Sequence, residues 1–223
     1  MKTAKLALIL FVLVLLIICL CSAQENVFMP DLSKIVKNDG WKVVNRNVSL
    51  LMVDGKPAAY LDGRAGDGVV WLEGFEFNNG TIEVDIKGKD EQGSSFVGIA
   101  FRGVDEKTYD AVYFRPFNFL SKDSVRKSHG VQYISYPVYT WEKLREEFPG
   151  KYENRVSNVS DPNIFFHARI VVQRPKITVF VNSSEEPSLV VEELSGRTSG
   201  WVGIWTGNYS DGTFTKFKIT KKD

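Results

Sequence analysis

Most of the chain alternates short apolar runs with turn-forming residues. From Trp41 onward, runs rich in Val, Ile, Phe and Tyr alternate apolar with polar positions, the two-residue period of a β-strand with one buried face. Dipeptides such as Asp54-Gly55 and Asn79-Gly80 mark turns between them. The pattern predicts strands over residues 41–45, 48–53, 57–61, 68–72, 80–87, 95–102, 108–115, 129–135, 165–173, 176–182, 188–193, 200–205 and 213–220. So many strands with almost no helix predict an all-β protein, a two-sheet antiparallel jelly-roll sandwich.

Two long connections, 116–128 and 136–164, interrupt this pattern with prolines, aromatic rings and charges. Apolar spacing over 141–148 predicts one short helix, ended by Pro149-Gly150. The part from 136 to 152 carries five aromatic residues, and long loops in compact domains are often functional. We expect it to fold over one end of a polar sheet face, with Leu144 and Phe148 packing down. Its rings then form one wall of a groove or, alternatively, a satellite core without a ligand role.

The N-terminus has the form of a secretory signal peptide. Lys2 and Lys5 precede an apolar run over 6–20, and small residues end this segment at Ala23. We expect cleavage after Ala23, one sandwich domain over 24–223, and a secreted or periplasmic protein. Large apolar residues precede both cysteines of this segment, which disfavours a lipid anchor there. No second apolar run is long enough to span a membrane.

Composition narrows the possible functions of the mature chain. Both cysteines lie in the predicted signal peptide, so no disulfide is expected. Without Lys2 and Lys5, 26 basic residues stand against 27 acidic ones, which gives no electrostatic case for nucleic-acid binding. His129 and His167 have no metal-ligand spacing, and no P-loop or nucleophile elbow occurs, so we expect no metal and no cofactor. Asn-X-Ser/Thr sequons occur at Asn47, Asn79, Asn158, Asn182 and Asn208.

The polar faces of several predicted strands share an unusual composition. They combine small residues, which would leave room for a ligand above the sheet, with Arg, Gln, Tyr and Trp. Aromatic rings stack on the C–H faces of sugars, while Arg and Gln hydrogen-bond to hydroxyl groups. The predicted binding residues are Arg102, Tyr113, Arg115, Gln132 and Trp205 on strands, with Tyr136, Tyr139 and Trp141 from the long connection. The alternative is an ordinary solvated sheet whose rings pack beneath that connection.

Carboxylates on one strand suggest glycosidase chemistry but do not complete it. Glu83, Asp85 and Lys87 share one face of the strand 80–87. Retaining hydrolysis needs two carboxyl groups about 5–5.5 Å apart, and Lys87 cannot be the carboxylic acid. We therefore expect Glu83 and Asp85 on a solvated face. They remain weak catalytic candidates together with His129 and Glu142.

Several stretches resemble the concanavalin A-like lectin/glucanase superfamily, near the bacterial 3-keto-disaccharide hydrolase family, which is similar to family 16 glycoside hydrolases. They are Gly80–Ile86, Ser95–Arg102, Tyr109–Pro116, Gly130–Tyr133, Gly200–Trp205 and Gly212–Ile219. The resemblance implies a jelly roll, a sugar-related role, and Arg102 and Gln132 in the groove. Gly130 stands where that family typically has a Glu, and Gly203-Ile-Trp205 departs from its usual Gln-X-His ending.

The sequence therefore predicts a secreted carbohydrate-recognition domain that binds an oligosaccharide or polysaccharide on the outer face of one sheet. One alternative is a glycoside hydrolase or lyase acting on 3-keto-glycosides or related sugars, which rests on the resemblance alone. A further alternative is a cell-surface module that binds protein through the aromatic connection.

Overall fold

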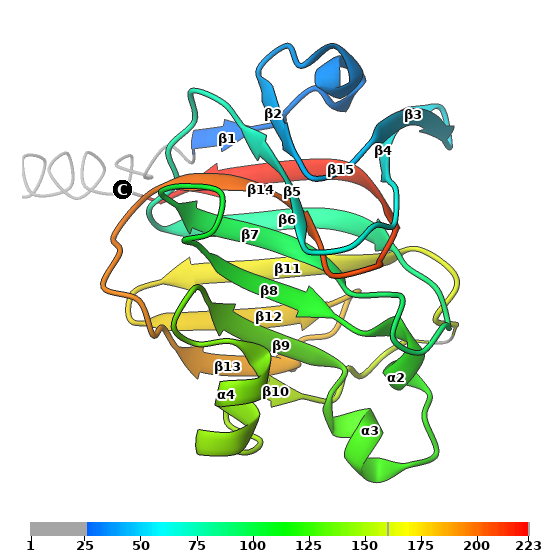
Figure 1. The fold of residues 1–223 in the computed structure, drawn as a ribbon, viewed down its shortest axis with the longest axis vertical. Coiled ribbons are helices and arrows are strands. Elements are labelled where there is room, and N and C mark those ends of the chain that lie inside the picture. The colour runs from blue at the N-terminus through cyan, green and yellow to red at the C-terminus, as the bar shows by residue number, and fades with distance from the viewer. Residues whose placement is uncertain (1–25, 160, 223) are drawn as a thin grey trace, which may run out of the picture.

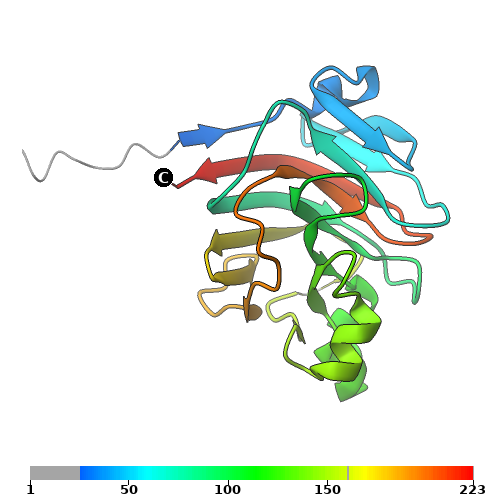
Figure 2. The same ribbon diagram turned by 60° about the vertical axis from the view of Figure 1, so that its left-hand side comes forward.

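Two antiparallel β-sheets pack face to face in a computed structural model that describes residues 26–159 and 161–222 (Figures 1 and 2). Sheet A has the order β13-β12-β11-β6-β15-β4-β3, with β1 beside β15, and sheet B has the order β10-β9-β8-β7-β14-β5-β2. The two-sheet antiparallel sandwich predicted from the sequence is confirmed. The predicted signal peptide and its cleavage site lie outside the described residues.

The strands follow the predicted alternation closely. Sheet A contains β1 (Asn26–Phe28), β3 (Val48–Val53), β4 (Lys56–Leu61), β6 (Gly80–Lys87), β11 (Phe166–Gln173), β12 (Lys176–Val181), β13 (Leu189–Glu192) and β15 (Gly212–Lys221). Sheet B contains β2 (Trp41–Val44), β5 (Gly68–Leu72), β7 (Val97–Gly103), β8 (Asp110–Phe114), β9 (Val131–Ser135), β10 (Glu153–Asn154) and β14 (Trp201–Thr206). Each predicted strand is present. The short β1 and β10 were not predicted, because two or three residues carry no readable period.

Within residues 26–159 and 161–222, four short helices connect the strands. They are a 3-10 helix (Leu32–Lys37), α2 (Pro116–Phe119), α3 (Ser124–Ser128) and α4 (Trp141–Glu147). The predicted helix is α4, and the Thr140 side chain caps its N-terminus by accepting a hydrogen bond from the backbone N–H of Lys143. Among the described residues, no helix is long and apolar enough to cross a membrane.

The outer face of sheet A is solvated, whereas the outer face of sheet B is covered. Along β11, buried and half-exposed residues alternate, so the outer face of sheet A meets solvent. Every residue of β7, β8 and β9 is buried, so the outer face of sheet B is covered as well as its inner face. The cover includes the long second connection: α4 contacts β9, and both views place α3 and α4 at the β9–β10 end of sheet B (Figures 1 and 2).

Candidate functional site

A continuous row of side chains crosses the outer face of sheet B. Strand register aligns Glu153, Gln132, Tyr113, Gly98, Trp205 and Val69 on β10, β9, β8, β7, β14 and β5. Because side chains alternate between the two faces, all six belong to the face opposite the core. The structure thus places Tyr113, Gln132 and Trp205 together, on the face that the sequence predicted.

These three side chains are nevertheless buried. Tyr113 and Trp205 are each 2% exposed and Gln132 is fully buried. The two rings lie 5.0 Å apart, and the Trp205 indole donates a hydrogen bond to the Tyr109 hydroxyl at 3.1 Å. They therefore form a floor of packed rings, as the packing alternative predicted, and do not stand free in an open groove.

Tyr109 and Trp71 extend this floor, and sequence reasoning did not select either. The Tyr109 ring packs edge-on against Trp71 at 5.6 Å and against Tyr136 at 5.3 Å. Strand alternation places Tyr109 on the face of Tyr113, and this signal was sufficient to find it. Trp71 lies in the uniformly apolar strand β5, where alternation cannot distinguish the two faces.

The glycines of this face allow neighbouring strands to approach closely, whereas the sequence suggested that they leave room for a ligand. A Cβ on Gly98 would lie 2.2 Å from the Val112 carbonyl oxygen, and a Cβ on Gly203 would lie 2.4 Å from the Val70 oxygen. The space that their missing side chains leave is therefore taken by neighbouring strands. This space is not free for a ligand, contrary to the expectation from the sequence.

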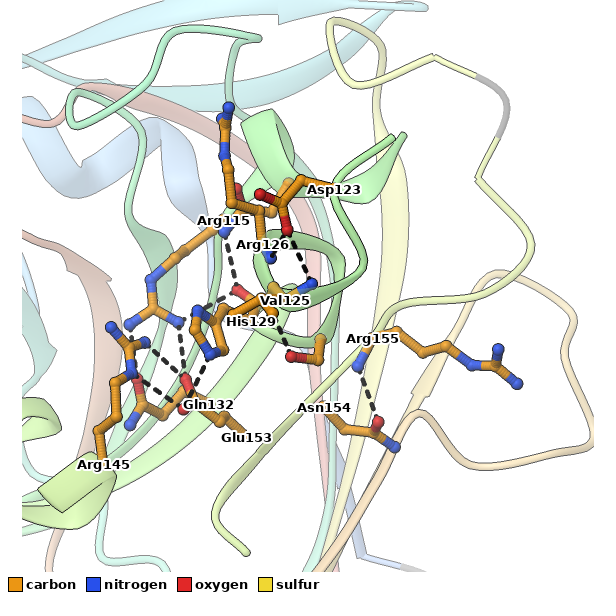
Figure 3. Close-up of polar contacts among 12 residues, drawn as sticks. Arg115, Asp123, Val125, Arg126, His129, Gln132, Arg145, Glu153, Asn154 and Arg155 are labelled. Carbon is orange, nitrogen blue, oxygen red and sulfur yellow. Dashed lines mark hydrogen bonds and ion pairs between the residues drawn. The ribbon is translucent and has the colours of Figure 1, made fainter. Parts of the chain in front are cut away.

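Arg115 ties the floor to a polar cluster at the β9–β10 edge of sheet B (Figure 3). Its guanidinium donates to the Tyr113 hydroxyl and to Gln132 Oε1, each at 2.5 Å, and to the His129 carbonyl at 3.1 Å. The Tyr113 hydroxyl also donates to Gln132 Oε1 at 2.8 Å. These bonds fix the position of a nearly buried cation below the surface.

Glu153 lies at the centre of the same cluster, although the sequence analysis did not select it. Arg145 donates to both carboxylate oxygens at 3.0 and 2.7 Å, while Arg115 and His129 Nε2 approach to 3.7 and 3.4 Å. The hydrogen bonds to Glu153 raise the pKa of Arg145. Burial, aided by Arg145 and Arg115, lowers the pKa of His129 despite the opposing effect of Glu153, so His129 is neutral near pH 7.

A hollow of about 240 Å³ opens above this cluster. We call it the arginine hollow. Its lining residues are Gln92, Gly93, Phe96, Arg115, Phe117, Asn118, Arg126, His129, Trp141 and Arg145. Trp141 is 39% exposed, and the Arg145 guanidinium lies 5.0 Å from its ring centre. The ring that begins α4 is therefore free on one side to meet a ligand, while Leu144 of the same helix is buried in the core.

A second hollow, of about 500 Å³, is lined in part by the 136–140 turn. We call it the tyrosine hollow. Its lining residues are Val44, Asn45, Asp67, Val69, Glu106, Lys107, Tyr109, Tyr136, Pro137 and Thr140. Burial raises the pKa of Asp67, although the Tyr136 hydroxyl bonds to the carboxyl group and acts against this shift. Tyr139, predicted as a groove residue, instead packs partly buried against the core, with Lys143 5.5 Å from its ring centre.

Arg102 is not on the outer face of sheet B, so its predicted position is wrong. Its φ of 51° lies in the left-handed region, within an irregular part of the β7–β14 pairing, and this interrupts the side-chain alternation. The fully buried guanidinium pairs with Glu193 and donates to the Asn78 carbonyl at 3.3 Å. Arg102 therefore serves a buried ion pair that no ligand on the outer face can reach.

The four weak catalytic candidates do not come together. Glu83 and Asp85 lie on the outer face of sheet A, where Lys218 pairs with Glu83 at 2.5 Å and Lys216 pairs with Asp85 at 2.6 Å. His167 Nδ1 lies 2.7 Å from Asp85. His129 lies beside Glu153 at sheet B, and Glu142 is exposed on α4. Glu83 and Asp85 thus lie on the outer face of sheet A, as the sequence predicted, but Asp85 is only 9% exposed and is less solvated than expected.

Within residues 26–159 and 161–222, no group of three or more His, Cys, Asp or Glu side chains is arranged to hold a metal ion. The two hollows of sheet B offer arginines, aromatic rings, hydroxyl groups and the Asp67 carboxyl group.

Comparison with known proteins establishes the fold. No family model and no curated protein match the chain. A Bacillus subtilis protein of unknown function with a galectin-like fold is similar over 87% of this chain and 94% of its own, with 10% identity and a TM-score of 0.56. A Bacillus licheniformis beta-glucanase covers 90% of this chain and 100% of its own, with 15% identity and a TM-score of 0.54. The carbohydrate binding module CBM66 from Bacillus subtilis covers 81% and 95%, with 15% identity and a TM-score of 0.52. The chain thus has the concanavalin A-like sandwich fold.

Proposed function

We propose that this protein is secreted and binds a carbohydrate on the outer face of sheet B, at the two hollows that the 136–148 segment helps to line. The observation that carries the proposal is Trp141, a half-exposed ring that stands beside Arg145 over a floor of fixed aromatic and polar side chains. An aromatic ring stacks on the C–H face of a sugar, and nearby arginines donate hydrogen bonds to its oxygens. Two of the structurally similar proteins are named as a carbohydrate binding module and a glucanase, which supports the same proposal.

Binding is favoured over hydrolysis because Glu153, the carboxylate that pairs with the arginines of the arginine hollow, is already engaged. Both Glu153 oxygens accept hydrogen bonds from Arg145, and the side chain is almost fully buried. A carboxylate in this arrangement has no free oxygen with which to attack a sugar or protonate a leaving group.

Hydrolysis, with 3-keto-glycosides or related sugars as substrates, is the second candidate, and Asp67 is the observation that favours it. Its carboxyl group lines the tyrosine hollow and has a raised pKa, as a proton donor requires. If the second candidate holds, Asp67→Asn abolishes turnover of a bound glycoside and leaves its affinity within about threefold. Absence of turnover by concentrated wild-type protein contradicts the second candidate without affecting the first.

The test of binding compares two aromatic substitutions on opposite faces. Trp141→Ala is expected to weaken glycan affinity roughly tenfold, about 1.4 kcal/mol, while the free energy of unfolding changes by only about 0.5 kcal/mol. The matched control is Phe180→Ala on sheet A, where Arg169 lies 3.8 Å from the ring centre in a similar cation–ring contact. Glycan-array screening followed by calorimetry measures both variants. Unchanged affinity in Trp141→Ala, or an equal loss in Phe180→Ala, contradicts the proposal.

A further inference from the structure

We propose that the arginine hollow selects acidic glycans, by binding the carboxylate of a uronic acid or the sulfate of a sulfated sugar. This inference rests on the proposed function and specifies the class of carbohydrate. The shared chemistry is a planar or tetrahedral oxyanion attached to a sugar ring.

The charge balance of the hollow is the first argument. Arg115, Arg126 and Arg145 all line it, and no acidic side chain does. The only carboxylate that pairs with these cations within the described residues is Glu153, which lies almost fully buried beneath them. Asp123 and Glu142 act on His129 and Arg145 from outside the lining, so the positive charge is concentrated on the walls of the hollow, where an anion would meet the three guanidinium groups first.

Arg126 supplies a cation that has no carboxylate partner among the described residues. Its guanidinium points away from the Glu153 cluster in Figure 3, while its backbone N–H is held by the Asp123 side chain at 3.1 Å. Across residues 26–159 and 161–222, no carboxylate lies within ion-pairing distance of this guanidinium, and it makes no side-chain hydrogen bond. All of its donors are therefore available to an oxyanion, and a guanidinium can grip a carboxylate or sulfate through two parallel bonds.

Two further cations of the hollow, Arg115 and Arg145, are already held in position for an anion. Three hydrogen bonds hold Arg115 in place, and Arg145 is held by its two bonds to Glu153, so neither side chain has to be ordered when a ligand arrives. The Asn118 side chain, which is 4% exposed, lines the same hollow, and its Oδ1 has no hydrogen-bond partner within the described residues.

The aromatic walls indicate a sugar as the carrier of the charge. Trp141, Phe96 and Phe117 line the hollow around the arginines. The Arg115 guanidinium lies 5.8 Å from the Phe96 ring centre, so ring and cation face the same space. A free inorganic anion would use the arginines alone, whereas an acidic sugar also uses the rings.

The experiment compares glycans that differ only in their charge. Oligogalacturonate is paired with its methyl ester, and sulfated chondroitin with chemically desulfated chondroitin, at constant ionic strength. Calorimetry on the full protein is expected to give at least roughly tenfold tighter binding for the acidic member of one pair, the effect of a hydrogen bond to a charged group. The pair that shows this effect identifies carboxylate or sulfate as the bound group.

Two variants on α3 separate local recognition from net charge. Arg126→Gln is expected to remove most of the preference for the acidic member. Lys127→Gln changes the net charge equally on the same helix but at an exposed residue outside the hollow, and it is expected to keep the preference. Thermal melts confirm that both variants fold.

The possible failures are distinguishable. If neutral and acidic members bind equally well, the inference is wrong while the proposed function stands. Equal losses in Arg126→Gln and Lys127→Gln also overturn it, because they show only a general charge effect. If wild-type protein binds no member of either pair and no neutral glycan on the array, the proposed function fails as well.

Discussion

Arg102 and Arg126 are two arginines whose surroundings give them different uses. Arg102 is fully buried and paired with Glu193, whereas Arg126 stands without a carboxylate partner in the described part of the chain. Without Arg102, the almost fully buried Glu193 would keep Arg174, at 2.5 Å, as its ion-pair partner but would lose the buried guanidinium in a poorly solvated place. A half-exposed arginine without a partner has no comparable effect on stability.

Arg102→Ala is therefore expected to lower the free energy of unfolding by about 2–3 kcal/mol, the cost of losing a buried hydrogen bond to a charged group. Arg126→Ala, the matched control, should change it by no more than about 0.5 kcal/mol. Urea unfolding followed by tryptophan fluorescence measures both. Similar stabilities for the two variants would contradict the assignment of Arg102 to a buried ion pair.

Asp85 makes stability depend on pH at low pH. Burial acts to raise the pKa of this carboxyl group, but hydrogen bonds from His167 and Lys216 outweigh it, so the folded-state pKa lies below the ordinary value. Its contribution to stability is therefore complete above the unfolded-state pKa, near 3.9, and is lost as the pH falls through the lower folded-state pKa.

In Asp85→Asn we expect a lower free energy of unfolding at pH 7, and a difference from wild type that shrinks as the pH falls below about 4. Denaturant unfolding at a series of pH values checks this. A stability difference that is the same at pH 7 and pH 3 would show that the charge of Asp85 is not the cause.

At the scale of elements, strand β7 can pair as it does only because it carries a glycine at position 98. A Cβ there would lie 2.2 Å from the Val112 oxygen and 2.6 Å from the Tyr113 Cα. Gly98→Ala is expected to cost about 1–3 kcal/mol, because the backbone of β8 must move. Gly196→Ala is the control, since a Cβ at Gly196 meets no atom within 4 Å. Equal melting temperatures for the two variants would contradict this account of the glycine.

Alternation predicted the strands and the composition of each face, because a two-residue period survives wherever one face is buried. Apolar spacing likewise predicted α4. The period does not say what covers a face. It therefore predicted the correct face for Tyr113 and Trp205 but wrongly predicted that they are exposed. It also fails where the backbone is irregular, as at Arg102, and in a strand as short as β10, which supplies Glu153.

The whole molecule is asymmetric across its sandwich. Sheet A presents solvated charges that pair with one another, such as Lys218 with Glu83. Sheet B is covered by rings and by the 136–148 segment, and the arginine and tyrosine hollows lie beside this cover. The central claim is that the covered face binds the glycan, with Trp141 in contact with it.

The five tryptophans of the chain report on this claim directly, because each indole N–H gives a separate signal in a proton–nitrogen NMR spectrum. Trp141 lines the arginine hollow and Trp205 lies in the floor, whereas Trp41 is buried and donates to the Asp31 carbonyl beside the 3-10 helix. Titration with a glycan that binds is expected to shift the Trp141 signal most, the Trp205 signal less, and the Trp41 signal hardly at all. A saturating titration in which the Trp141 signal stays in place would contradict the claim.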